Sequence, residues 1–129
     1  MLNDPLANAL SAIMTYEKIG RKELKIHPVN KIIRRVLAIM QEKGYTGALE
    51  DLNEGRGGFA KLNLIGNVNQ CGVIKPRFAI KKTDFQKFEK RYLPANGVGI
   101  LILSTPHGFM THEQAREKGI GGRLIAYCY

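Results

Sequence analysis

Residues 97–116 carry the most distinctive structural signals of the chain, and they read Gly97-Val98-Gly99-Ile100-Leu101-Ile102-Leu103-Ser104-Thr105-Pro106-His107-Gly108-Phe109-Met110-Thr111-His112-Glu113-Gln114-Ala115-Arg116. The apolar run at 100–103 is short and bounded by turn residues, which favours a buried strand over a helix. This strand delivers Ser104 and Thr105 to the surface as a pair, and the proline and glycine at 106–108 then turn the chain sharply. We therefore expect a compact hydrogen-bonding platform with no obvious catalytic base.

The residues after this stretch predict a short helix and a closing strand. Thr111 and Gln114 have the spacing of a capping box, so a helix begins there, and Gly119 ends it. The turn Gly121-Gly122-Arg123 then leads into a last strand at 124–129.

The residues before it predict an edge strand and a short amphipathic segment. Residues 73–80 have strand composition, and Pro76 confines this strand to an edge or a bulge because proline cannot donate to a ladder. Within 81–91, Phe85 and Phe88 are three residues apart and are flanked by lysine and arginine. Such rings can stack on nucleic-acid bases, but two rings at helical spacing are more typical of a core.

The N-terminal end predicts a helix. Pro5 fits the first helical position, where its missing N–H is not needed, and Asp4 can cap the helix. Apolar residues recur at helical spacing as far as Gly20, which is a natural stop; they are Leu6, Leu10, Ile13 and Met14. Asn3 and Asp4 at the helix mouth carry a second hypothesis of anion contact, although the charge of Asp4 favours capping.

A strand and a second helix follow. Residues 23–27 alternate as a strand does, and after Pro28 a helix begins near Asn30. Its apolar stripe comprises Ile32, Ile33, Val36, Leu37 and Met40, and three basic residues crowd the other side near its start: Lys31, Arg34 and Arg35. The cluster is either a solvated face or a set of phosphate contacts, and the sequence leaves both interpretations open.

These elements predict an α/β (α+β) protein made of two small lobes. The first lobe, residues 1–65, ends in a β-hairpin whose strands, 45–52 and 59–64, are joined by a glycine-rich loop. The second lobe, residues 66–129, begins with a linker and is mainly β with a short helix.

Composition limits the classes of function. The chain has 129 residues, with 20 Lys and Arg against 11 Asp and Glu, a net charge of +9 and a pI near 9.8. After Gly66 there are 10 basic and 4 acidic residues, so that half carries +6. This field suits a polyanion such as nucleic acid or an acidic membrane. No apolar run approaches the ~18 residues of a membrane span, and residues 1–20 lack a signal-peptide pattern, so we expect a cytoplasmic protein without a membrane partner.

The number and spacing of the cysteines agree with a cytoplasmic protein. Cys71 and Cys128 are far apart and belong to no C-x-x-C pair, so both thiols are predicted to be free.

Three partial catalytic motifs fail on context. The run 55–60 matches G-x-G-x-x-A but precedes a strand, whereas a dinucleotide fingerprint opens a helix. His112 begins H-E-x-x-H, but Arg116 occupies the place of the second histidine, so we expect His112 to be a surface residue rather than a zinc ligand. Ser104 and His107 lack a nucleophile elbow and an orienting third group. We expect no catalytic residue, metal, cofactor or small-molecule substrate, and a nucleic-acid-binding module is favoured.

Residues 97–116, followed by Lys118-Gly-Ile-Gly-Gly-Arg123, resemble the C-terminal signature of the ribosomal protein S8 family of the small subunit. Three other stretches are similar to that family, and together they cover essentially the whole chain in order: Asp4-Pro-Leu-Ala-Asn-Ala-Leu10, Pro28-Val-Asn-Lys-Ile-Ile33 and Gly44-Tyr45. The resemblance implies two α/β lobes, no enzyme activity, and early, direct binding to the central domain of small-subunit rRNA. It also implies neighbouring small-subunit proteins as partners.

The resemblance implies specific rRNA contacts as well. The Ser-Thr-x-x-Gly loop of the family corresponds to Ser104, Thr105 and Gly108. Further candidates match the family or lie at its helix starts: Asn3, Asp4, Pro5, Asn30, Lys31, Arg34, Gly121, Gly122 and Arg123.

The chain departs from the bacterial pattern Ser-Thr-Ser-Lys-Gly, because Pro106 and His107 replace the second serine and the lysine. We therefore do not expect this chain to make the rRNA contacts of that second serine and that lysine. Asn30 replaces a frequent serine, and the end 127–129 lacks the common tryptophan, so the chain resembles the archaeal or eukaryotic branch. The alternative function is an RNA-binding translational regulator or nucleic-acid chaperone outside the ribosome.

Overall fold

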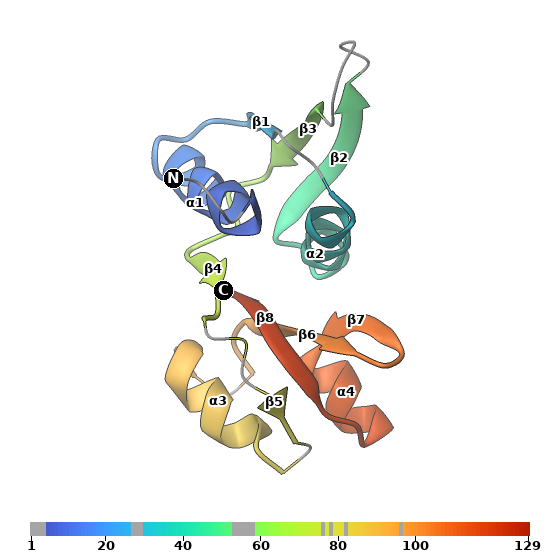
Figure 1. The fold of residues 1–129 in the computed structure, drawn as a ribbon. Helices are drawn as coiled ribbons and strands as arrows, with labels where there is room; N and C mark the ends of the chain where they lie inside the picture. The colour runs from blue at the N-terminus through green and yellow to red at the C-terminus, as the bar shows by residue number, and fades with distance from the viewer. Residues whose placement is uncertain are drawn as a thin grey trace. The chain divides into compact units, whose positions relative to one another are not determined.

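The computed structural model describes residues 5–26, 30–52, 59–75, 77, 79–81, 83–95 and 97–129. It contains both helices and antiparallel sheets, so the predicted α+β class is confirmed (Figure 1). The chain divides into two compact units, Met1–Cys71 and Gly72–Tyr129. The hairpin loop 53–58, Pro76 and the end of the strand predicted at 23–27 lie outside the described residues.

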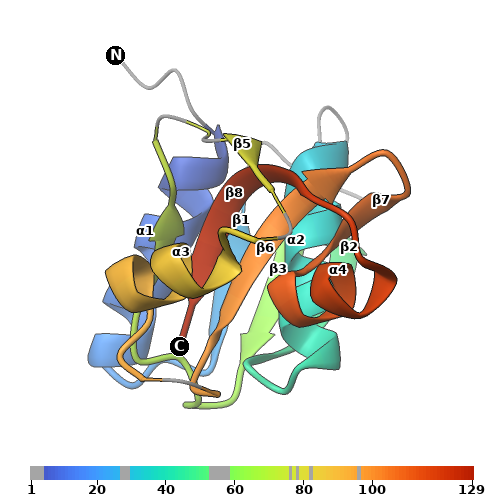
Figure 2. The ribbon, with the colours of Figure 1, turned by 90° about the horizontal axis from the view of Figure 1, so that it is seen from below.

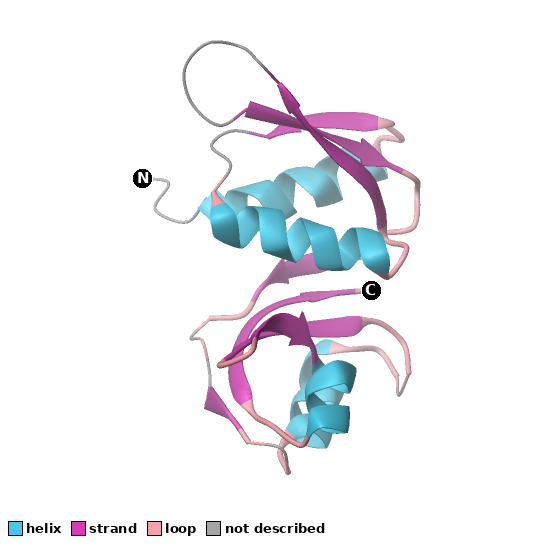
Figure 3. Ribbon diagram, turned by 90° about the vertical axis from the view of Figure 1, so that its right-hand side faces the viewer, coloured by secondary structure: helices cyan, strands magenta, loops and turns pink. Residues whose placement is uncertain are grey.

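The first unit is a three-stranded sheet with two helices on one face (Figure 3). Its elements are α1 (Pro5–Lys18), β1 (Glu23–Ile26), α2 (Lys31–Glu42), β2 (Thr46–Leu52) and β3 (Phe59–Leu64). The strand order is β1-β3-β2, and both pairings are antiparallel. The apolar stripes predicted for the helices face the core, where Leu10, Ile13 and Ile33 are fully buried.

The predicted end of the first helix is confirmed. Gly20 has a φ of 76°, the left-handed conformation that favours glycine. Its N–H donates to the Glu17 carbonyl at 3.2 Å, and the Arg21 N–H donates to the Tyr16 carbonyl at 3.0 Å. These two bonds satisfy carbonyls that the helix leaves unpaired at its last turn.

The second unit is built on a five-stranded sheet. Its elements are β4 (Cys71–Val73), β5 (Ala79–Ile80), α3 (Phe85–Tyr92), β6 (Ile100–Thr105), β7 (Gly108–Thr111), α4 (His112–Lys118) and β8 (Gly122–Cys128). The strand order is β4-β8-β6-β7, and β5 also pairs with β8. Figure 2 shows β8 running beside β6, the strand predicted from the apolar run at 100–103. The sheet also carries α3, a second helix besides the predicted one.

The prediction of one strand over residues 73–80 is wrong. Two short strands, β4 and β5, both pair with β8, and the described residues between them, Ile74, Lys75 and Arg77, belong to no strand. The Ile74 N–H still donates to the Ile125 carbonyl at 3.0 Å, but Lys75 lies in a bend. Pairing with the same neighbour on both sides of the interruption keeps the segment at the sheet edge, as expected.

Phe85 and Phe88 belong to the core, which confirms the favoured interpretation of their spacing. Their exposed fractions are 1% and 6%. They pack in one apolar cluster with Leu101 and Leu103 of β6 and Ala115 of α4. Alternate residues of a strand share a face, so α3 and α4 cover the face of the sheet that carries Leu101 and Leu103.

Both cysteines are free and buried, as predicted. The Cys71 thiol lies 3.4 Å from the Leu10 carbonyl oxygen, and burial raises its pKa to about 12. A thiol with so high a pKa is a space-filling group rather than a nucleophile at neutral pH.

Candidate nucleic-acid interface

Five of the predicted site residues meet at one end of the five-stranded sheet. In the β6–β7 hairpin Thr105 pairs with Gly108, and across β8 Ser104 pairs with Arg123. Gly122 precedes Arg123, so it lies beside Thr105; a Cβ added to Gly122 would be 3.0 Å from the Thr105 methyl carbon. Residues from three strands thus form two neighbouring cross-strand rows.

The Thr105 hydroxyl organises the turn. It donates to the Gly108 carbonyl at 2.7 Å and accepts from the His107 N–H at 3.1 Å. Gly108 has a φ of 107°, which an L side chain rarely adopts. The hydroxyl therefore holds the backbone of the turn in place. The Thr105 side chain is also half-exposed at the surface.

Ser104 faces the other side of the sheet from Thr105. Its neighbour Leu103 is fully buried against the helices, so alternation places Ser104 on the face that α3 and α4 do not cover. It is half-buried between half-buried Phe109 and exposed Arg123, its partners in register. Within the part of the chain that the structure describes, its hydroxyl has no hydrogen-bond partner, so it is available to a ligand.

Gly121 and Gly122 have a structural role in bringing these rows together. A Cβ at Gly121 would lie closer than 3.0 Å to the Ile80 carbonyl oxygen, and one at Gly122 would lie as close to the Ser104 carbonyl oxygen. Real Cβ atoms do not approach backbone oxygens so closely. The absence of side chains therefore lets β8 pack against its neighbours beside the Ser104-Thr105 pair.

The remaining candidates lie at the helix starts of the first unit. Pro5 is the first residue of α1, while Asn3 and Asp4 lie outside the described residues. The Asn30 side-chain oxygen caps α2 by accepting from the Ile33 N–H at 2.9 Å. Lys31 and the next basic residue on that helix, Arg34, are exposed. The cap fixes the first turn of α2 and therefore the backbone positions that carry these two cationic side chains.

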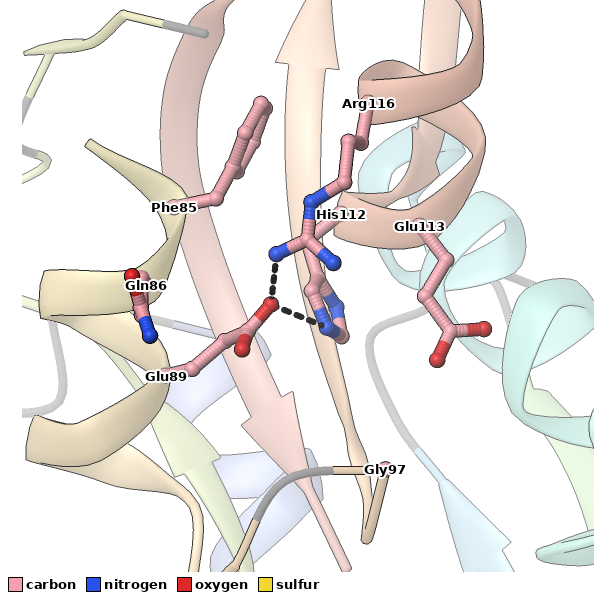
Figure 4. A pocket seen from close by; sticks show the side chains of 7 residues that line it. All are labelled: Phe85, Gln86, Glu89, Gly97, His112, Glu113 and Arg116. Carbon is pink, nitrogen blue, oxygen red and sulfur yellow. Dashed lines mark hydrogen bonds and ion pairs between the residues drawn. The ribbon is translucent and has the colours of Figure 1, made fainter. Parts of the chain in front are cut away.

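The prediction that His112 is a surface residue is wrong. Its exposed fraction is 3%, because it begins α4 directly beneath the sheet. The Leu101 N–H donates to its Nδ1 at 3.1 Å, so the proton lies on Nε2, which is 3.2 Å from a Glu89 carboxylate oxygen. Arg116 donates to the same oxygen (Figure 4). The three side chains link α3 to α4.

This arrangement predicts a stability that depends on pH. Burial lowers the pKa of His112 below its ordinary value of 6.5, although the nearby Glu89 charge acts in the opposite direction. The unfolded chain then binds the proton more readily, so stability falls as the pH decreases through about 6.5. Urea unfolding at about pH 7.5 and about pH 5.5 measures the loss. The His112→Gln variant should lose less stability over that interval; an equal loss in both proteins would contradict the assignment.

The described residues contain no group of three or more His, Cys, Asp and Glu side chains that could hold a metal ion. In the same part of the chain, no helix is both long and apolar enough to cross a membrane. The chemistry that the sheet end does present consists of a hydroxyl, glycine backbone and an arginine.

A basic α+β protein that displays hydroxyl, backbone and guanidinium groups at a sheet end has the features of an RNA-binding protein. Comparison with known families makes the assignment specific. The family model of ribosomal protein S8 matches residues 4–129, nearly the whole chain, and the chain belongs to that family. It is therefore a ribosomal protein that binds rRNA and functions in translation as part of the small-subunit ribonucleoprotein, and its family is structural rather than enzymatic.

Sequence patterns alone miss Glu89, whose side chain links α3 to α4, and they predict Thr105 only as an rRNA contact, not as the residue that holds the turn. Glu89 lies between Phe88 and Lys90 in a basic segment and has the pattern of a solvated residue, yet its side chain is 10% exposed. The turn role of Thr105 also has no periodic signal. The capping box is the exception, because the Thr111 N–H bonds to the Gln114 side chain at 3.0 Å and the Gln114 N–H bonds to the Thr111 hydroxyl at 3.3 Å.

Proposed function

We propose that this protein binds the central domain of small-subunit rRNA directly and early in assembly. The observation that carries the proposal is the meeting of Ser104, Thr105, Gly108, Gly122 and Arg123 at one sheet end. Early binding means binding to the bare rRNA without other proteins, and a preformed site supports it because little has to become ordered on binding.

The chemistry of this surface suits an irregular RNA helix. A-form RNA has a narrow major groove that side chains do not reach, so proteins recognise it through the shallow groove, the 2′-hydroxyls and splayed bases. The short Ser104 side chain and the glycine backbone of the turn allow close approach to such a surface. Arg123 adds positive charge beside them, and charge supplies affinity without regard to base sequence.

The basic start of α2 is proposed as a second contact region, with Asn30 and Lys31 beside Arg34. We expect Arg34→Gln combined with Arg35→Gln to reduce the slope of log affinity against log salt by about 1–2, because each lost phosphate contact removes about 0.9 from that slope on a duplex. Binding titrations to a central-domain transcript over a range of salt concentrations measure it. Lys43→Gln, at the other end of α2, is the matched control; an unaltered slope in the double variant would remove both arginines from the contact set.

We further propose that the chain is of the archaeal or eukaryotic type. Pro106 and His107 support this, since they stand where the bacterial pattern has a serine and a lysine. His107 is exposed at the tip of the turn, and its N–H is used by Thr105. The turn is thus held by backbone and threonine contacts and requires neither of the bacterial side chains.

Equilibrium binding tests the choice of rRNA domain. The purified chain should bind a central-domain transcript at least tenfold more tightly than equal lengths of the other small-subunit rRNA domains at the same salt concentration. Equal affinity for all transcripts and for an unrelated duplex would contradict the proposal and support a general nucleic-acid chaperone.

A further inference from the structure

A second surface lies in the first unit, away from its proposed rRNA contacts at the starts of α1 and α2. A cavity of about 270 Å³ is lined by the turn that ends α1 and by the end of β3, including Gly20, Leu64 and Ile65. This volume is below the usual range of small-molecule pockets, so it suits one or two inserted side chains rather than a cofactor.

The walls of this cavity are preformed. The Leu64 N–H donates to the Lys22 carbonyl at 2.8 Å, which ties the end of β3 to the chain that follows α1. The Glu17 carboxylate accepts from the Val68 N–H at 3.2 Å and fixes the chain that follows β3. Gly20 and Gly66 both have positive φ, 76° and 80°, with open space where a Cβ would be.

Apolar side chains are exposed at this place. Ile65 lines the cavity and is 50% exposed, and Ile19, directly before the lining residue Gly20, is 63% exposed. They are two of the three large apolar residues that are exposed in the described part of the chain. Exposed apolar groups beside a cavity with a polar rim are typical of a protein–protein contact.

The charge of the rim defines the partner further. Lys18, Arg21 and Lys22 lie at the end of α1 and in the turn, and among the described residues no carboxylate forms a salt bridge with them. The Arg21 guanidinium is held over the Tyr16 ring, 5.7 Å from its centre. Two carboxylates lie nearby: Glu17 lines the cavity and accepts from the Val68 N–H, and Glu23 pairs with Lys61 at 3.6 Å. Against Lys18, Arg21 and Lys22 they leave the surroundings of the cavity with an excess of positive charge.

We propose that this cavity, with its exposed isoleucines and basic rim, docks a segment of a neighbouring protein in the small subunit that presents an apolar side chain next to Asp or Glu. The apolar side chain enters the cavity beside Ile65, and the carboxylates meet Arg21 and Lys22. RNA phosphates would satisfy the basic rim but would leave the apolar cavity and Ile65 exposed, so the protein segment fits the surface better. The inference rests on membership of the small subunit and not on which rRNA domain the protein binds.

Site-specific photocrosslinking in purified small subunits tests this. With p-benzoylphenylalanine at position 65, we expect one ribosomal protein to be crosslinked at a peptide that contains an apolar residue flanked by Asp or Glu. The same probe at Ala38, an exposed position on α2, should not capture that peptide. Crosslinking to rRNA, to a second copy of this chain, or to no peptide above the Ala38 background would overturn the proposal.

Charge and shape variants separate this contact from rRNA binding. With the probe at 65, Arg21→Glu plus Lys22→Glu should lower the crosslink yield at least tenfold, whereas Lys43→Glu plus Lys90→Glu should not.

In a probe-free competition for incorporation into small subunits, Ile65→Asp should be displaced by the wild type, and Ile65→Leu should compete equally. The affinity of the isolated Ile65→Asp chain for central-domain rRNA should be unchanged. An undiminished yield in the double-reversal variant would contradict the role of the rim, even if the proposed rRNA binding holds.

Discussion

Gly122→Ala is expected to destabilise the protein by about 3 kcal/mol, at the upper end of the range for overpacked sites. The added methyl group would collide with the Ser104 carbonyl oxygen and would touch the Thr105 methyl group. Backbone oxygen in a ladder cannot move aside without breaking the pairing of β6 with β8. Urea unfolding measures the loss, and the displaced Ser104 should weaken rRNA binding in the same variant.

Arg123→Ala is the matched control for that prediction. It removes an exposed side chain from the same strand without adding an atom, so its effect on stability should stay within about 0.5 kcal/mol. If Gly122→Ala unfolds at the same urea concentration as the wild type, the close approach of β8 to β6 does not constrain this position.

Ser104→Ala combined with Thr105→Ala should weaken binding to the cognate rRNA by about 1–3 kcal/mol, which is about 5- to 150-fold in Kd. In the proposed interface the Ser104 hydroxyl bonds to the RNA, so its removal would leave an RNA group without its partner. Removing the Thr105 hydroxyl releases both hydrogen bonds that hold the turn. Titration of the purified variants with a central-domain transcript measures the change.

Single variants separate the two contributions. Thr105→Val keeps the shape of the side chain but loses the turn bonds, so its loss of affinity should be accompanied by greater mobility of residues 106–108. Ser104→Ala should lower affinity while leaving the turn intact. Ser11→Ala, at an exposed serine of α1, is the control, and an unchanged Kd for the double variant would remove the hydroxyl pair from the interface.

Much of the fold follows from local sequence signals because those signals agree with tertiary packing. Pro5 and Gly20 bound α1 as their backbone preferences require, and Asn30 caps α2 through its side chain. The apolar run at 100–103 forms the first four residues of β6, and every residue in it is buried, on both faces of the strand. In each case the local preference of the residue, for a helix end, a helix cap or a buried strand, is the same as the place that the fold gives it.

The signals fail where long-range contacts decide. His112 follows a helix cap and has the neighbours of a solvated residue, but the Leu101 N–H requires an acceptor beneath the sheet, and His112 supplies it. Glu89 is buried for the same reason, since from another helix it accepts from the His112 Nε2–H and pairs with the Arg116 guanidinium. Neither contact has a period in the sequence, because the partners are 11 to 27 residues apart.

The candidate site is predictable from the sequence only in part. The hydroxyl pair and the turn are predicted from residues 104–108 themselves, whereas the joining of Gly122 and Arg123 to them depends on the register of β8 against β6. That register contains an irregularity between Ile102 and Leu103. A shift of one residue reverses the faces of a strand, so no local pattern could place Arg123 beside Ser104.

A chemical footprint of the purified protein on complete small-subunit rRNA shows which rRNA domain the protein binds and whether the Ser104-Thr105 turn is used. We predict a localised footprint in the central domain, at an irregular helix, that is lost first in the Ser104→Ala and Thr105→Ala double variant as protein concentration is lowered. Protection spread evenly over every duplex, or a footprint confined to another domain, would exclude specific binding to the central domain.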